Sequence, residues 1–278
     1  MRRRAPQRAS GALEEGAETS ATGVTECCAV QMTQGSNPHS RATFLGTLSP
    51  EARAAFTRLG TRRRYAAGDV LIREGNHDQE LVVLHEGLVK VTARLDRDRE
   101  SLMDIWTPGD VVGERAALGL GPRSATVIAC GDVAATVIPS HELKDFLLTH
   151  PEMSLSLIQM VCGRASRSDR LRLELGGYPV PVRLARVLVE LAESCGRPAE
   201  TFRGPNWNKV RIDVNLSQSE FAALTASTTN TVHKALAHLR RHKIITTGSR
   251  KTSVEDMARL RKAARLSAPP GSSASKPH

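Results

Sequence analysis

The chain has 278 residues, 39 lysines and arginines against 29 aspartates and glutamates, and a formal net charge of +10. This length suits one large domain or two ordinary domains with tails. Without an apolar run of about 18 residues we expect no transmembrane helix and no membrane partner. The charge is uneven: residues 1–177 carry 22 basic and 22 acidic side chains, whereas residues 178–266 carry 16 and 7. The C-terminal third is therefore predicted to meet an anionic partner such as nucleic acid.

The N-terminal segment and the cysteines indicate the compartment. Residues 1–40 are rich in Ala, Gly, Ser and Thr and are predicted to be a disordered tail. The arginines at positions 2–4 are not followed by an apolar core, so we expect no secretory signal. An odd, scattered set of thiols is typical of a reducing compartment, and we expect the protein in the cytoplasm. The cysteines are Cys27, Cys28, Cys130, Cys162 and Cys195.

A first folded domain is predicted over residues 41–150. Ser49 followed by Pro50 and Glu51 is typical of a helix start, with a capping hydroxyl, a proline at the first helical position and an acid in the first turn. Residues 65–140 then contain short β runs separated by Gly, Pro and Asp. This punctuation predicts a barrel or jelly-roll arrangement of strands.

Residues 113–127 carry the first functional pattern. Glu114 lies in a turn of small residues and can accept a hydrogen bond from a ribose hydroxyl, whereas Arg123, nine positions later, can donate two hydrogen bonds to a cyclic phosphate. Backbone N–H groups of the turn can hold the same anion. The pattern predicts a cyclic-nucleotide site. Its candidate residues are Val112, Gly113, Glu114, Arg115, Ala116, Arg123, Ser124 and Ala125.

Residues 151–177 are predicted to form a long dimerisation helix that ends in a hinge at residues 176–179, where Gly-Gly-Tyr-Pro breaks the pattern. Small or apolar residues recur at steps of three and four, a coiled-coil spacing that predicts a parallel partner helix; packing against the same chain is the alternative. We call the side of the helix that carries these residues the seam. Ser168 lies on the seam and either faces a bound purine or is a small residue that a coiled coil tolerates. The seam residues are Ile158, Val161, Ala165, Ser168, Leu171 and Leu175.

The basic region, residues 178–266, is predicted to contain an apolar helix, a loop over residues 196–205, a strand over residues 210–214 and then two short helices. Ser217 can cap the first short helix, with Glu220 completing a capping box. After a break at residues 225–227, a second helix follows, and residues 244–254 predict a hairpin with a basic tip. A last helix is expected over residues 255–266, and residues 267–278 are predicted to be a disordered tail.

Two short helices joined by a tight turn indicate a helix-turn-helix that binds double-stranded DNA. Asn and Lys side chains can read base edges in the major groove, whereas Ser and Gln at a helix start suit phosphate contacts. The candidate DNA-binding residues are Ser217, Gln218, Thr228, Thr229, Asn230, Thr231, His233, Lys234, Arg240, Arg250 and Lys251.

The order of these parts resembles the Crp/Fnr family of bacterial transcription regulators. The resemblance is carried by Gly-Glu-x-Ala-x-Leu and Pro-Arg-Ser-Ala-Thr-Val within residues 113–127, and by residues 216–245. It implies an α+β fold with an N-terminal cyclic-nucleotide-binding β-roll (jelly-roll-like), a long dimerisation helix and a C-terminal winged helix-turn-helix. It also implies a homodimer on a palindromic operator, allosteric control by cyclic AMP, with cyclic GMP not excluded, and RNA polymerase as a further partner.

The chain departs from family members close to the cyclic-AMP receptor at two places. Thr229, Asn230 and Lys234 stand where those members show Arg, Glu and Arg, so a different operator sequence is expected. Ser168 is followed by Asp169 instead of a second hydroxyl residue, so the purine contact is only half preserved. The cysteines that would ligate an iron–sulfur cluster in other branches are missing.

Two alternatives stay open. A regulator of the same fold could bind DNA independently of cyclic AMP or sense another effector. In a different class, the chain could be a cyclic-nucleotide regulatory subunit of an enzyme or channel. We find no nucleophile–base motif, Walker loop or metal-ligand spacing in the sequence, so we predict no catalytic residues and no metal ligands, and we do not expect an enzyme.

Overall fold

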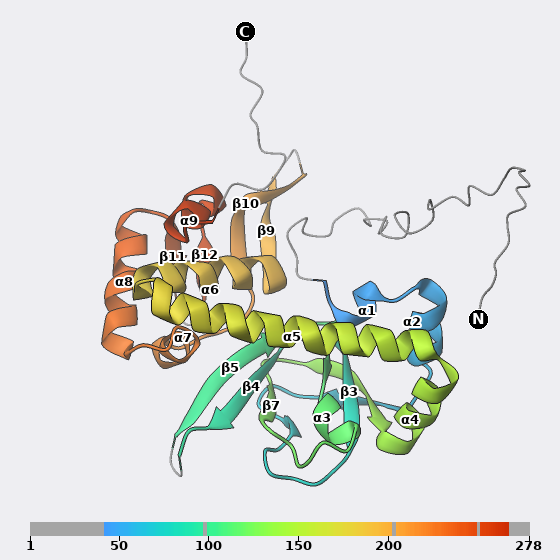
Figure 1. Cartoon of the computed structure of the whole chain (residues 1–278). Coiled ribbons are helices and arrows are strands. Elements are labelled where there is room, and N and C mark those ends of the chain that lie inside the picture. Colours follow the sequence, from blue (N-terminus) through green and yellow to red (C-terminus); the bar gives the residue numbers. More distant parts are fainter. Residues whose placement is uncertain (1–41, 97–98, 202–203, 249–250, 267–278) are drawn as a thin grey trace, which may run out of the picture. The chain divides into compact units, whose positions relative to one another are not determined.

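The computed structural model describes residues 42–96, 99–201, 204–248 and 251–266, and Figure 1 shows their helices and strands. The tails predicted at residues 1–40 and 267–278 lie outside the described residues. Among the helices of the described part, none has the length and apolar character needed to cross a membrane.

Two antiparallel sheets form the N-terminal β-roll, with strand orders β1-β8-β3-β6 and β2-β7-β4-β5. The central strand β3 carries a continuous apolar run from Leu81 to Leu84, which is buried throughout because the strand has core on both faces. Gly87 between β3 and β4 has φ +80°, and a side chain there would collide with the backbone of Asp132, so the turn requires glycine. The strands are β1 (Thr61–Tyr65), β2 (Val70–Ile72), β3 (Glu80–Glu86), β4 (Val89–Arg94), β5 (Glu100–Trp106), β6 (Val111–Val112), β7 (Thr126–Ala129) and β8 (Val133–Pro139).

Short helices pack against the core of the roll. The predicted start of α2 is confirmed, since the Ser49 hydroxyl accepts a hydrogen bond from the backbone N–H of Ala52 at 3.2 Å. Phe56 lies between Phe44 and Phe146, with ring centroids 5.5 Å and 5.8 Å apart respectively. Aromatic pairs in such tilted arrangements add to the burial of apolar surface. These helices are α1 (Phe44–Thr47), α2 (Pro50–Phe56), α3 (Glu114–Ala117) and α4 (Ser140–Thr149).

The predicted long helix is α5 (Pro151–Gly177). Its start is buried in the roll, where Met153 and Leu157 join the aromatic core. Beyond them the apolar residues face outward: Ile158 is 57% exposed and Val161 is 41% exposed. The helix ends at Gly177, and the next helix, α6 (Val180–Cys195), starts after Pro179, so the predicted break is confirmed.

The C-terminal region contains three further helices around a sheet with strand order β11-β12-β10-β9. One prediction was wrong here: of residues 196–205, expected to be a loop, residues 196–201 form β9 and residues 204–205 begin β10. The reason is long-range pairing. Strand β10 bonds on one side to β12, which with β11 forms the hairpin that we call the wing, and on its other side β10 bonds to β9. The elements are β9 (Gly196–Thr201), β10 (Gly204–Ile212), α7 (Gln218–Leu224), α8 (Thr229–Arg241), β11 (Ile245–Thr247), β12 (Thr252–Val254) and α9 (Met257–Ala263).

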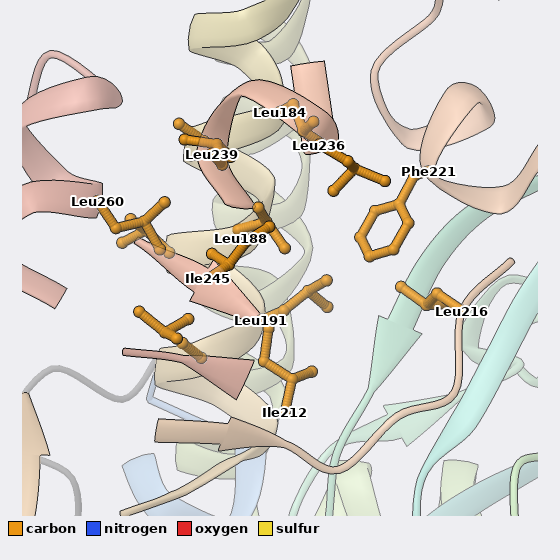
Figure 2. Packing of buried hydrophobic residues seen from close by; sticks show 14 of the residues in the cluster. Leu184, Leu188, Leu191, Ile212, Leu216, Phe221, Leu236, Leu239, Ile245 and Leu260 are labelled. Atoms are coloured by element: carbon orange, nitrogen blue, oxygen red, sulfur yellow. The ribbon is translucent and has the colours of Figure 1, made fainter. Parts of the chain in front are cut away.

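A single apolar cluster holds this region together, and Figure 2 shows its main members. Leu188 comes from α6, Phe221 from α7, Leu236 from α8 and Ile245 from β11, and all four are buried. Each such side chain contributes about 1.5–3 kcal/mol when it is fully buried. The apolar spacing of α8 therefore fixes which of its faces points outward.

Candidate functional site

A cavity of about 360 Å³ opens in the roll beside α3. Its size lies within the range of small-ligand pockets, about 300–1,000 Å³. All eight roll residues proposed from the sequence line it, and they are joined by an aromatic side chain, several aliphatic ones and one arginine from α5. The lining residues are Ile72, Val91, Ala93, Met103, Trp106, Val112, Gly113, Glu114, Arg115, Ala116, Arg123, Ser124, Ala125, Val127 and Arg164.

The turn at Gly113 places both charged residues of the pattern, Glu114 and Arg123, in the wall of the cavity. Gly113 has φ +85°, in the left-handed region, and a side chain there would collide with the guanidinium of Arg123. The one-turn helix α3 follows at once and carries Glu114 at its first position. The first N–H groups of such a turn have no partner within the helix and are open to an acceptor.

Arg123 is held in the wall of the cavity and is only 3% exposed. Its Nε and Nη2 groups donate to Asp78 Oδ2 at 2.9 Å and 2.6 Å. Its Nη1 group donates to the carbonyl oxygens of Glu80 at 2.7 Å and Gly113 at 3.2 Å. The guanidinium is therefore fixed before any ligand arrives. Sequence reasoning missed Asp78, which lies 45 residues from Arg123 and shares no motif with it.

Glu114 is paired with an arginine of the long helix. Arg164 Nη1 lies 2.9 Å from Glu114 Oε1, and Arg164 Nη2 donates to the carbonyl oxygen of Val111 at 2.6 Å. The guanidinium carbon also lies 3.9 Å from the centroid of the Trp106 ring, which is cation–π geometry. Buried Arg164 Nε has no hydrogen-bond partner among the described residues. Through Arg164, α5 closes one side of the cavity.

The sequence pointed to Ser168 on α5, whereas the cavity is lined by Arg164. Ser168 is exposed and is not among the lining residues. Residues four positions apart lie on the same side of a helix, so the two are neighbours along α5. The four-residue spacing from Ser168 is the signal in the sequence that could have placed Arg164 on the side of α5 that faces the cavity. The proposed contact of Ser168 with a purine stays a prediction.

Helix α8 presents a polar face. Its apolar residues Val232, Leu236 and Leu239 are buried, so the opposite side is open to solvent. The proposed DNA-binding residues that lie on it or cap it are all exposed: Thr228, Thr229, Asn230, Thr231, His233, Lys234 and Arg240. One of them is restrained, since Arg240 Nη1 donates to the hydroxyl of Thr247 in the wing at 3.0 Å.

The start of α7 has the predicted capping box. The backbone N–H of Glu220 donates to Ser217 Oγ at 3.2 Å, and the backbone N–H of Ser217 donates to Glu220 Oε2 at 2.7 Å. Ser217 is half-buried, whereas Gln218 and Lys251 are exposed. Arg250, the remaining candidate, lies outside the described residues. In the described part of the chain, no three metal-ligating side chains gather.

Comparison with known proteins identifies both regions. Residues 62–150 match the family model of the cyclic nucleotide-binding domain, and residues 182–263 match that of the Crp-like helix-turn-helix domain. The CRP-like cAMP-activated global transcriptional regulator of Mycobacterium tuberculosis is 28% identical over 226 residues, which cover 81% of this chain and 98% of that protein.

Solved structures agree with these matches. A transcriptional regulator of the CRP/FNR family from Thermus thermophilus aligns with a TM-score of 0.61 and 25% identity, over 74% of this chain and 98% of that one. A second regulator of the CRP family from the same organism aligns with a TM-score of 0.59 and 26% identity, over 73% and 96%. The two regions thus define a cyclic-nucleotide-binding, DNA-binding transcription regulator. The chain belongs to the Crp/Fnr family.

Proposed function

We propose that this regulator responds to cyclic AMP and acts as a homodimer on a palindromic operator. The observation that carries the effector assignment is the cavity that Glu114 and the buried guanidinium of Arg123 both line. A carboxylate and a guanidinium beside a one-turn helix suit the ribose and the cyclic phosphate of one nucleotide. The cAMP-activated mycobacterial relative supports the same choice of ligand.

In this proposal each polar group of the cavity has one role. Glu114 accepts a hydrogen bond from the ribose hydroxyl. The contacts of Arg123 within the chain use four of its five N–H groups, and we assign the fifth to the cyclic phosphate. The backbone of Val112, Gly113, Arg115, Ala116, Ser124 and Ala125 forms the rest of the phosphate and ribose site. Ser168 does not line the cavity of the single chain, and its contact with the purine is kept as a proposal. Cyclic GMP is the competing ligand that the experiment must compare.

The homodimer is supported by the exposed apolar side of α5. Leu155 is 62% exposed, and Ile158, Val161 and Leu175 also face solvent in the isolated chain. Such a stripe on a helix of 27 residues is typical of a coiled-coil seam. Residues 151–177 are therefore the proposed dimerisation helix and hinge, between the nucleotide domain at residues 41–150 and the DNA-binding domain at residues 178–266.

The DNA-binding step uses α8 as recognition helix. In a twofold dimer, two copies would reach half-sites about 34–36 Å apart, one helical turn of DNA. Asn230 and Lys234 are the proposed readers of base edges, and Ser217, Gln218 and Lys251 the proposed phosphate contacts. RNA polymerase is the further partner we propose, together with a cytoplasmic location beside chromosomal DNA and no catalytic activity.

One observation favours a second candidate, a regulator of the same fold that does not need cyclic AMP. Both charged groups of the cavity already have partners in the chain: Glu114 pairs with Arg164, and Arg123 pairs with Asp78. A pocket that satisfies its own charges can be structural, or it can take another effector.

Calorimetric titration with cyclic AMP and cyclic GMP distinguishes the two candidates. The proposal predicts saturable binding of cyclic AMP that weakens at least about tenfold in Glu114→Gln, because a hydrogen bond to a charged group contributes about 1.5–3 kcal/mol. Arg123→Ala should abolish binding. Glu100→Gln, at an exposed position on β5, is the matched control. Absence of binding by either nucleotide would favour the second candidate.

A further inference from the structure

The cavity beside α3 carries more positive than negative charge. Three arginines line it, Arg115, Arg123 and Arg164, together with the carboxylate of Glu114. A second carboxylate belongs to the site through Asp78, which pairs with Arg123. Arginine side chains stay protonated in proteins, so three guanidiniums are set against two carboxylates. With both carboxylates ionised, the site holds one net positive charge.

Two of the three arginines are already balanced by carboxylates of the chain. Arg123 Nη2 lies 2.6 Å from Asp78 Oδ2. Arg164 Nη1 lies 2.9 Å from Glu114 Oε1, and the two side chains are only 20% and 18% exposed. Opposite charges this close together largely cancel each other's field at larger distances. Neither of these guanidiniums therefore supplies the net charge of the site.

Arg115 differs from both. It follows Glu114 directly in α3, it lines the cavity, and it is exposed to solvent. In the part of the chain that the structure describes, no carboxylate pairs with its guanidinium and no side-chain hydrogen bond restrains it. All five N–H groups of this side chain are thus open to a ligand or to water. Because Arg115 both lines the cavity and meets solvent, it lies at the mouth.

We propose that the side chain of Arg115 is a further recognition group of this cavity, and that it selects a ligand with one net negative charge. The inference rests on the proposed function, since a cyclic nucleotide carries a single negative charge on its phosphodiester. Arg123 stays tied to Asp78 and directs a hydrogen bond, whereas Arg115 supplies the charge that offsets the incoming anion. Arg115 thus has a side-chain role in addition to the backbone role proposed above.

The exposure of Arg115 sets the size of its effect and makes that effect depend on salt. An exposed pair of opposite charges changes a binding equilibrium by up to about fivefold at low ionic strength. Salt weakens the attraction, because the Debye length falls from about 10 Å at 0.1 M to about 3 Å at 1 M. The charge at position 115, more than the shape of the side chain, should then decide the affinity for the nucleotide.

The test is calorimetric titration of the full-length protein and three variants with cyclic AMP and cyclic GMP, at about 0.05 M and about 0.5 M salt. Arg115→Lys keeps the charge, Arg115→Gln removes it and Arg115→Glu reverses it. At low salt we expect the affinity of Arg115→Lys to stay within about twofold of the wild type, that of Arg115→Gln to fall about fivefold, and that of Arg115→Glu to fall further. At high salt the affinities should converge.

Arg53→Gln is the matched control. Arg53 is exposed on α2 and is not among the residues that line the cavity, so this variant removes the same charge from the same domain at a different place. We expect its affinity for the nucleotide to equal that of the wild type at both salt concentrations. Urea unfolding of every variant checks the fold, and the variants at position 115 should keep their stability because Arg115 is exposed and unpaired among the described residues.

Two kinds of result would overturn the inference while leaving the proposed function intact. Equal affinities of the wild type, Arg115→Gln and Arg115→Glu would show that the side chain does not act on the ligand. A loss in Arg115→Lys as large as in Arg115→Gln, or a loss that salt does not change, would show that charge is not what position 115 contributes. If the wild type binds neither nucleotide, the proposed effector fails and the inference fails with it.

Discussion

Asp78 offers a sharp test of how the pocket is built, because it holds Arg123 without being part of the sequence pattern. We predict that Asp78→Asn destabilises the protein yet does not weaken nucleotide binding. Removing one partner of a buried ion pair costs about 3–5 kcal/mol. Asp78 is 39% exposed, and asparagine keeps one acceptor oxygen, so solvent screening reduces the expected loss to about 1–2 kcal/mol.

The affinity of Asp78→Asn for the nucleotide is maintained because the ligand replaces the charge that the variant has lost. A cyclic phosphate supplies this negative charge, and in the variant its charge is no longer repelled by the carboxylate of Asp78. Urea unfolding with and without saturating cyclic AMP measures both effects, since a ligand that binds only the folded state adds stability according to its affinity. The added stability should be equal or larger in the variant. No loss of stability without ligand, or a clearly smaller gain with it, would refute this account of Arg123.

Three further predictions concern other parts of the chain. Ile158→Asp should convert a dimer to a monomer in light scattering, whereas Leu148→Asp, which changes an exposed leucine on α4, should not. Dimers in both variants would contradict the proposal that α5 forms the dimer interface. Lys234→Ala should weaken binding to a selected operator by about 1–3 kcal/mol without changing stability, and Lys144→Ala on α4 should not change the affinity for DNA. An unchanged affinity of Lys234→Ala for the operator would contradict the proposal that α8 contacts DNA. Because the pKa of Glu220 is lowered on folding, its stabilisation should be complete above its ordinary value of 4.5 and should be lost as the pH falls through the lowered value. The difference in unfolding free energy between wild type and Glu220→Gln should therefore be smaller at about pH 3.5 than at about pH 7, and a constant difference would contradict the ion pair of Glu220 with Lys90.

Local signals explain why much of the fold could be predicted. The cap at Ser49 and the capping box at Ser217 depend on residues three positions apart, and both are present. The turn at Gly113 needs a left-handed residue, and only glycine adopts it without strain. The eight roll residues proposed for the nucleotide lie together because they belong to one short segment, residues 112–125, which runs from the end of β6 through α3 to the start of β7.

Features that depend on tertiary contacts were missed. Arg164 meets Glu114 only because α5 packs beside the roll, and no periodicity in the sequence reports that pairing. Asp78 meets Arg123 across 45 residues. Residues 196–205, which contribute β9 and the start of β10, were predicted to be a loop because their glycines and prolines resemble loop residues, whereas pairing of β10 with β9 and β12 builds a sheet. The purine contact of Ser168 depends on a partner helix and stays a prediction.

Operator binding measured with and without cyclic AMP tests the central claim most directly. Fluorescence anisotropy with a DNA duplex obtained by selection would report the affinity of the wild type and of Glu114→Gln at fixed salt. Our account predicts at least about tenfold tighter binding by the wild type when cyclic AMP is present, and a much smaller change for Glu114→Gln at a cyclic AMP concentration that saturates only the wild type. The same affinity with and without the nucleotide in the wild type would contradict it.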